Sequence, residues 1–326
     1  QVRTTLSSYT LTANVENLTF TGTGNFAGTG NGLNNILAGG AGNDTLSGGG
    51  GDDRIDGGAG DDIMIGGTGN DLYFVNQAGD AVQEAAGEGT DQVRTTLSTY
   101  TLGANVENLT FTGTGAFDGT GNDLNNILAG GAGNDTLRGE GGNDRIDGGA
   151  GDDIMIGGTG DDLYFVNQAG DIVQEAAGEG TDQVRTTLSS YTLTANVENL
   201  TFTGTGNFTG TGNEGANWII GGAGNDRLDG GAGNDTLNGV GGNDIFVFGA
   251  PNFGQDRILG FDADEVGGQD LIDISGLGVN AATFNALVTI QGTGLDTMIT
   301  IGEDSIRLVD IGDPATITMD DFILGS

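Results

Sequence analysis

Length, composition and charge restrict the chemistry open to this chain. Its 326 residues include 67 Gly and 2 Pro, and its formal net charge is -37. It has no Cys and no His, which excludes disulfides, thiol chemistry, histidine-based zinc sites and histidine general bases. The acidity argues against nucleic acid and anionic membranes as partners, because like charges repel. No stretch approaches the roughly 18 apolar residues of a membrane span.

The chain repeats at long range. The heptapeptide QVRTTLS begins at Gln1, Gln92 and Gln183, which gives a period of 91 residues. The first two blocks are nearly identical, and the third diverges near its end. The chain begins within the repeat and without Met, so we expect a further segment before Gln1. The expected parts are block one at 1–91, block two at 92–182, block three at 183–247 and a C-terminal part at 248–326.

The first half of each block alternates apolar and polar residues, which predicts short strands. In the stretch from Leu18 to Thr23, Leu18 and Phe20 share one face and the threonines share the other. An ice-binding or sugar-binding threonine array is one alternative. Such an array needs its motif on successive coils, whereas this motif returns only after 91 residues. We therefore expect an inward apolar face and an outward polar one.

The second half of block one contains four consecutive nonapeptides, from Gly39 to Phe74. They are GGAGNDTLS, GGGGDDRID, GGAGDDIMI and GGTGNDLYF, and each fits Gly-Gly-x-Gly-x-Asp-x-U-x, where U is a large apolar residue. Glycine permits positive φ and close packing of chain on chain, which exposes carbonyl oxygens. Calcium takes about six to eight oxygens from carboxylates and carbonyls. The pattern therefore predicts calcium-binding turns.

The sixth position of each nonapeptide supplies the predicted carboxylate ligand. The eighth side chain should point into the core, because successive strand residues alternate faces. Degenerate nonapeptides come before the regular ones, with Asn35, Asn126 and Asn217 at the sixth position, and these are expected to be weaker sites or plain turns. The predicted carboxylate ligands are Asp44, Asp53, Asp62 and Asp71 in block one, Asp135, Asp144, Asp153 and Asp162 in block two, and Asp226, Asp235 and Asp244 in block three.

The segments outside the nonapeptides are less regular. Residues 75–91 are expected to be looser coils of the same solenoid, with a flexible linker as the alternative. Trp218, Phe246 and Phe248 are expected to pack in the core or in a cap. Beyond Phe248 the sequences LVTIQ, TMITI and SIRLV predict strands, and NAATFNAL predicts one short helix. A repeat stack needs a distinct end over its open edge, so we expect the tail to be a β cap.

The nonapeptides resemble the RTX (repeats-in-toxin) proteins. The resemblance implies an all-β, right-handed parallel β-roll or β-helix solenoid, with about eight calcium ions between turns that lie two nonapeptides apart. It pairs Asp44 with Asp62 and Asp53 with Asp71, and likewise pairs Asp135 with Asp153, Asp144 with Asp162 and Asp226 with Asp244. The implied carbonyl ligands are those of Gly40, Gly42, Gly57 and Ala59 at the first site and of Gly49, Gly51, Gly66 and Thr68 at the second.

The C-terminal part resembles that of RTX proteins such as the serralysin proteases. The similar segment is DRILGFDADEVGGQDLIDISGLG, and the last residues, Asp321 to Leu324, resemble a type I secretion signal. The resemblance implies a protein secreted by a Gram-negative bacterium, to its surface or the medium, with the type I secretion machinery as a partner. Calcium is abundant outside the cell, so folding on exit would be driven by ligand binding.

Three classes of function remain open. The first is a structural surface, adhesin, surface-layer or filament protein, for which self-assembly or cell-surface polysaccharide would be the further partner. The second is the secretion and stabilising module of a larger enzyme, such as a protease, lipase or alginate epimerase. The third is catalysis by acidic pairs such as Asp52 and Asp53. These pairs recur in every turn, unlike a unique active site, so we expect the chain not to be an enzyme.

Overall fold

The computed structural model describes residues 1–264 and 268–326. The chain divides into two compact units, one of Gln1–Asp162 with Gly170–Val173 and one of Leu163–Ala169 with Gln174–Ser326. Each is a parallel β-solenoid, which confirms the predicted all-β fold. The serralysin-like segment includes residues 265–267, which lie outside the described residues.

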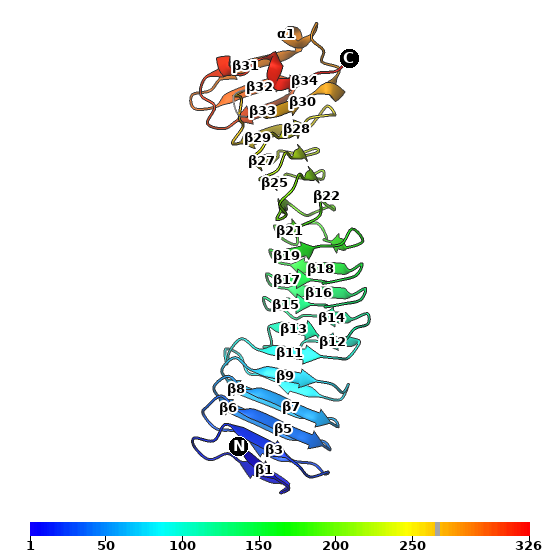
Figure 1. Ribbon diagram of the computed structural model, residues 1–326, viewed down its shortest axis with the longest axis vertical. Helices are drawn as coiled ribbons and strands as arrows, with labels where there is room; N and C mark the ends of the chain where they lie inside the picture. The colour runs from blue at the N-terminus through cyan, green and yellow to red at the C-terminus, as the bar shows by residue number, and fades with distance from the viewer. Residues whose placement is uncertain (265–267) are drawn as a thin grey trace. The chain divides into compact units, whose positions relative to one another are not determined.

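In the first unit, consecutive strands alternate between two sides of the solenoid (Figure 1). One side contains β1 (Val2–Thr4), β3 (Asn17–Phe20), β5 (Ile36–Ala41), β7 (Arg54–Ala59), β9 (Leu72–Val75), β11 (Gln92–Thr95), β13 (Asn108–Phe111), β15 (Ile127–Ala129) and β17 (Arg145–Asp147). The other contains β2 (Ser8–Thr10), β4 (Ala27–Thr29), β6 (Thr45–Gly50), β8 (Ile63–Thr68), β10 (Ala81–Gln83), β12 (Thr99–Thr101), β14 (Asp118–Thr120), β16 (Thr136–Gly141) and β18 (Ile154–Thr159). Strand β20 (Ile172–Gln174) comes two strands after β18 in the sequence, and its first two residues belong to this unit.

The second unit has the same alternation. One side contains β19 (Leu163–Val166), β21 (Gln183–Thr186), β23 (Asn199–Phe202), β25 (Trp218–Gly222), β27 (Thr236–Val240) and β29 (Gln255–Leu259). The other contains β22 (Ser190–Thr192), β24 (Thr209–Thr211), β26 (Arg227–Asp229), β28 (Ile245–Val247), β30 (Leu271–Asp273) and β34 (Phe322–Ile323). The pairs formed within these sides are parallel.

The strand register explains the nonapeptide repeat. Leu37 in β5 lies beside Ile55 in β7, and Leu46 in β6 lies beside Met64 in β8. Partners are 18 residues apart because two nonapeptides make one coil, one strand on each side. These four side chains and Tyr73 are fully buried, which confirms the predicted inward position.

The halves without nonapeptides belong to the same solenoids. Phe20 stacks on Phe26 with ring centroids 4.6 Å apart, and Phe111 stacks on Phe117 at the same distance. Residues 75–91 are also coiled, because β10 pairs in parallel with β8 and β11 pairs with β9. This confirms the prediction of looser coils over that of a flexible linker.

The C-terminal part ends the second unit with antiparallel strands. Strand β33 (Asp304–Leu308) pairs in parallel with β29 and antiparallel with β32 (Thr297–Ile301), which pairs antiparallel with β31 (Val288–Gly292). The predicted strands and short helix are therefore confirmed. The helical elements are η1 (Ser275–Leu277), α1 (Phe284–Leu287), η2 (Pro314–Thr316) and η3 (Met319–Asp321). In the described part of the chain, the helices are too short and too polar to cross a membrane.

The prediction for Trp218 is wrong, although those for Phe246 and Phe248 are confirmed. Phe246 and Phe248 are buried, whereas Trp218 is 49% exposed. Trp218 is the first residue of β25, and the buried side chain there is Ile219. Alternation along the strand places the indole outside, and this outweighs its apolar character.

Candidate metal centre

Each turn brings a carboxylate and a carbonyl to one point. Gly40 and Gly42, at positions two and four, have φ of 99° and 107°, a region that favours glycine. A Cβ on Gly39, at position one, would lie 2.2 Å from Asp44 Oδ2 and 2.6 Å from the Gly57 carbonyl oxygen. The missing side chain at position one thus leaves room in which two oxygens from neighbouring coils converge.

The predicted aspartates form ladders along the turns. Asp44 N–H donates to Asp62 Oδ1 over 2.7 Å, and Asp53 N–H donates to Asp71 Oδ1 over 2.6 Å. The structure therefore brings together the residues that the resemblance paired in block one. The corresponding bonds run from Asp135 to Asp153, from Asp144 to Asp162 and from Asp226 to Asp244, with lengths of 2.7–2.8 Å.

The second oxygen of most of these carboxylates is buried without a partner. Among the described residues, Oδ2 accepts no hydrogen bond in Asp44, Asp53, Asp62, Asp71, Asp135, Asp144, Asp153, Asp226 and Asp235. All nine side chains are at most 2% exposed. Burying an anionic oxygen without a partner costs folding free energy, so each of these atoms requires a cation or a proton.

The electrostatics agree with this geometry. Burial raises the pKa of Asp53 to about 7 and that of Asp44 to about 6, and the negative charges of Asp71 and Asp62, respectively, add to the rise. Burial likewise raises the pKa of Asp144 and Asp244 to about 7. A bound divalent cation would instead lower the pKa of these aspartates, because it stabilises the ionised carboxylates. Buried carboxylates beside backbone carbonyl oxygens match the all-oxygen ligand set that calcium takes, so the residues fit the ion.

The individual carbonyl ligands remain a prediction. Gly57 is placed as expected, because its oxygen faces the same point as Asp44 Oδ2. Gly66 stands in the same relation to Asp53, since a Cβ on Gly48 would lie 1.9 Å from Asp53 Oδ2 and 2.8 Å from the Gly66 oxygen. The Ala59 oxygen already accepts a hydrogen bond of 2.9 Å from Gly42 N–H.

The turns with Asn at position six differ from those with Asp. Asn35 Oδ1 accepts a hydrogen bond of 2.7 Å from Asn31 N–H within its own turn. Asn126 and Asn217 accept the same bond, also of 2.7 Å, from Asn122 and Asn213. The amide oxygen is therefore used locally, which favours plain turns over weaker calcium sites.

Sequence reasoning missed carboxylates that continue the ladders beyond the nonapeptides. Asp62 N–H donates to Asp80 Oδ1, and Asp71 N–H donates to Asp91 Oδ1. In block three, Asp256 accepts from Asp235 N–H and Asp270 accepts from Asp244 N–H. The signal for Asp91 was present in the stretch AGEGTD at 86–91, which differs from Gly-Gly-x-Gly-x-Asp only by Ala at position one.

Coils built from glycine-rich turns with converging carboxylates define a parallel β-roll with acidic turns. A family model described as the RTX calcium-binding nonapeptide repeat matches this chain in three regions. The chain therefore contains RTX calcium-binding nonapeptide repeats, as the sequence predicted, and these repeats imply calcium binding. The matches cover residues 29–64, 39–73, 120–155, 130–164, 140–172 and 211–246.

Similar proteins include several enzymes. An endo-1,3-1,4-beta-glycanase of Rhizobium meliloti (strain 1021) is 48% identical over 62 residues, which are 19% of this chain and 13% of that protein. The chain thus spans a small part of this relative's length. The R3 subunit of the Azotobacter vinelandii mannuronan C5-epimerase is 30% identical, with a TM-score of 0.32, over 40% of this chain and 80% of that one. The extracellular lipase of Serratia marcescens is 22% identical, with a TM-score of 0.26, over 73% and 45%.

Proposed function

We propose that this chain is a secreted structural protein that folds when it binds calcium and then assembles through its repeated surface. It would act as a cell-surface, adhesin, surface-layer or filament component. Type I secretion by a Gram-negative bacterium is part of the proposal, and it rests on the C-terminal resemblance. Calcium outside the cell would drive folding, because the ion binds only the folded turns.

An exposed apolar residue that recurs once per block carries this proposal. Ile36, Ile127 and Trp218 hold the same block position, and they are 43%, 44% and 49% exposed. Leu33 and Leu124, three residues earlier in their blocks, are also exposed. A single exposed apolar side chain needs no explanation. Recurrence at the same block position supplies equivalent contact points, which an assembling protein requires.

The second candidate is a secretion and stabilising module of a larger enzyme. Its support is the glycanase segment, which is 48% identical over 62 residues. That segment is a small fraction of the glycanase, so it is a part shared with an enzyme and says nothing of catalysis in this chain. Under this alternative the repeats would stabilise a catalytic domain encoded before Gln1.

Electron microscopy of the natively secreted protein, with calcium and after chelation, tests the proposal. We expect sheets or filaments that dissolve on chelation. Replacing Ile36, Ile127 and Trp218 together by Thr should weaken assembly without unfolding the β-roll. The matched control is Leu295→Thr, which removes a 78% exposed apolar residue outside the repeats and should leave assembly intact.

Single particles in both conditions would contradict the structural role. The coding sequence before Gln1 would then decide the alternative. A domain without repeats would support an enzyme module, and further 91-residue blocks would exclude it.

A further inference from the structure

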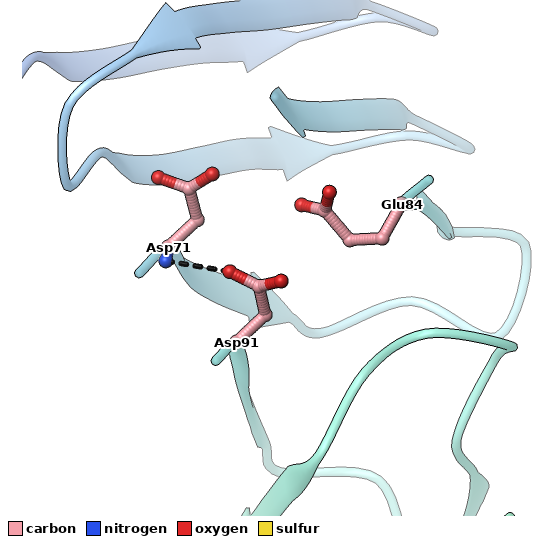
Figure 2. A group of neighbouring side chains, drawn as sticks. All are labelled: Asp71, Glu84 and Asp91. Atoms are coloured by element: carbon pink, nitrogen blue, oxygen red, sulfur yellow. Dashed lines mark hydrogen bonds between the residues drawn. The ribbon is translucent and has the colours of Figure 1, made fainter. Parts of the chain in front are cut away.

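We infer that Asp71, Glu84 and Asp91 form a calcium site with three carboxylates, distinct in its ligands from the sites between nonapeptides (Figure 2). The site would fasten residues 76–91 to the last nonapeptide of block one. The inference rests on calcium binding by the repeats and adds a site that the nonapeptide pattern does not contain.

The three side chains come from the ends of different strands. Asp71 directly precedes β9, Glu84 directly follows β10, and Asp91 directly precedes β11. One oxygen of each lies within 4.8 Å of one oxygen of the others. Calcium binds oxygens at about 2.3–2.6 Å, so two ligands of one ion lie up to about 5 Å apart. The three oxygens can therefore share one ion, and Figure 2 shows Glu84 extending toward both aspartates.

Buried oxygens without partners distinguish this cluster from ordinary surface acidity. Asp71 is 2% exposed and Asp91 is 1% exposed. Among the described residues, Asp71 Oδ2 and Glu84 Oε2 accept no hydrogen bond. Tyr73, fully buried in the core, donates its hydroxyl to Glu84 Oε1. The phenol thus orients Glu84 and leaves its other oxygen available to an ion.

The position of Glu84 corresponds to that of a carbonyl ligand elsewhere. A Cβ on Gly48 would meet Asp53 Oδ2 and the Gly66 carbonyl oxygen. A Cβ on Gly66 would lie 2.0 Å from Asp71 Oδ2 and 2.4 Å from Glu84 Oε1. The carboxylate of Glu84 therefore takes the place that a backbone carbonyl holds one coil earlier. The series of sites along the turns therefore continues beyond the nonapeptides. This site has one more negative charge, because a carboxylate stands in place of a carbonyl.

No positive side chain balances this charge in the part of the chain that the structure describes. The salt bridges found there join Arg54 to Asp56, Arg138 to Asp118, Arg227 to Asp273 and Arg307 to Asp296. Two buried carboxylates and one half-buried carboxylate, with no basic partner among the described residues, require a cation or protons. Calcium affinity rises with the number of charged ligands, so this site should bind more tightly than a site with two carboxylates.

The same residue types recur 91 residues later. Asp162, Glu175 and Asp182 hold the equivalent sequence positions. Tyr164, the equivalent of Tyr73, donates its hydroxyl to Glu175. The tyrosine–glutamate pair thus recurs in blocks one and two.

The first test is the calcium content of the full chain after equilibrium dialysis. Glu84→Gln keeps the shape of the side chain and its acceptor for Tyr73, but removes one charge. We expect a loss of one ion per chain. The matched control is Glu88→Gln, four residues later in the same segment, which should retain every ion. An unchanged ion count in Glu84→Gln would overturn the inference.

The second test uses the tyrosine at the site. Terbium replaces calcium at oxygen sites and emits when a nearby tyrosine is excited. In a Tyr164→Phe, Trp218→Phe background, limiting terbium should give emission sensitised by Tyr73. Tyr73→Phe and Glu84→Gln should each reduce it at least fivefold, whereas Tyr9→Phe should not. Emission that persists in both variants would place the ion elsewhere.

The two tests separate this inference from the proposed function. A wild-type chain that binds no calcium would overturn both. A wild-type chain that binds calcium, together with a Glu84→Gln variant that keeps the full ion count and the emission, would overturn the three-carboxylate site alone.

Discussion

Asp53 and Asp71 are joined across one coil by a hydrogen bond of 2.6 Å from the backbone N–H of Asp53 to Oδ1 of Asp71. The bond fixes the orientation of the Asp71 carboxylate and leaves its Oδ2 buried without a partner among the described residues. Asp53 repeats the arrangement toward Asn35, whose N–H it accepts over 2.6 Å. The N–H of each coil thus orients the carboxylate of the next coil, and the buried second oxygen of that carboxylate requires a cation or a proton.

Asp53→Asn should lower the number of calcium ions that the chain binds. The substitution keeps the size of the side chain and the acceptor for Asn35 N–H, but removes the charge that holds the ion. We expect calorimetric titration to show at least one ion fewer. In calcium at 100 to 1,000 times the dissociation constant, losing one site should lower the free energy of unfolding by about 3–4 kcal/mol.

Asp52→Asn is the matched control for that prediction. Asp52 is the neighbouring residue, but it is exposed, and its Oδ1 accepts from Asn70 N–H at the surface. Asn at this position retains the acceptor, so calcium content and stability should stay within about 0.5 kcal/mol of the wild type. A loss of ions in Asp52→Asn equal to that in Asp53→Asn would show that general acidity, and not the ladder, binds calcium.

Removal of calcium should unfold the β-roll at neutral pH. The buried carboxylates of the turns would face one another without cations, and the chain has 67 glycines whose ordering is entropically costly. We expect circular dichroism to change from β-sheet to an unfolded spectrum on chelation and to recover when calcium is restored. A spectrum unchanged by chelation would show that packing alone maintains the fold.

In the metal-free chain, acid should partly replace calcium. Burial raises the pKa of Asp53 and Asp144 to about 7 and that of Asp44 and Asp135 to about 6. Their pKa in the unfolded chain lies near 3.8, so the folded state binds protons more tightly. Their contribution to stability is therefore fully present below about pH 3.8 and is lost as the pH rises through 6 to 7.

Thermal melts of desalted, calcium-free protein at pH 4.5, 6 and 7.5 measure this dependence. We expect the midpoint to fall with rising pH. With saturating calcium the order should reverse, because protons compete with the ion for the same carboxylates. A calcium-free midpoint that rises with pH would contradict the predicted carboxylate burial.

The sequence predicted the turns and their inward residues because both depend on local spacing, whereas the pairing of aspartates two nonapeptides apart came from the resemblance to RTX proteins. Glycine at fixed positions sets the turn, and the eighth residue sets the core, so Leu46 and Met64 could be placed without a structure. Glu84 could not be placed, because its contact with Asp71 depends on how a segment without the nonapeptide pattern coils. Trp218 was misplaced because residue type was given more weight than strand alternation.

Gly58→Ala tests whether glycine is required by the coil-to-coil approach. Gly58 has φ of 98°, and a Cβ there would lie 2.2 Å from the backbone oxygen of Gly40 in the previous coil. The left-handed backbone alone costs an alanine about 1–2 kcal/mol. The clash is with backbone, which cannot move aside without separating β5 from β7. We therefore expect Gly58→Ala to lower the free energy of unfolding by at least about 2 kcal/mol in saturating calcium.

Gly24→Ala is the control for this prediction, measured by the same denaturant titration. A Cβ on Gly24 would meet no atom within 4 Å, and the residue does not have positive φ. Its substitution should change stability by less than about 0.5 kcal/mol, since it lies at the surface. Calcium content should distinguish the two as well, because a displaced Gly40–Gly58 pair disturbs the turns that hold Asp44 and Asp62. Equal stability and equal ion counts in the two variants would show that the coils tolerate a side chain at position two.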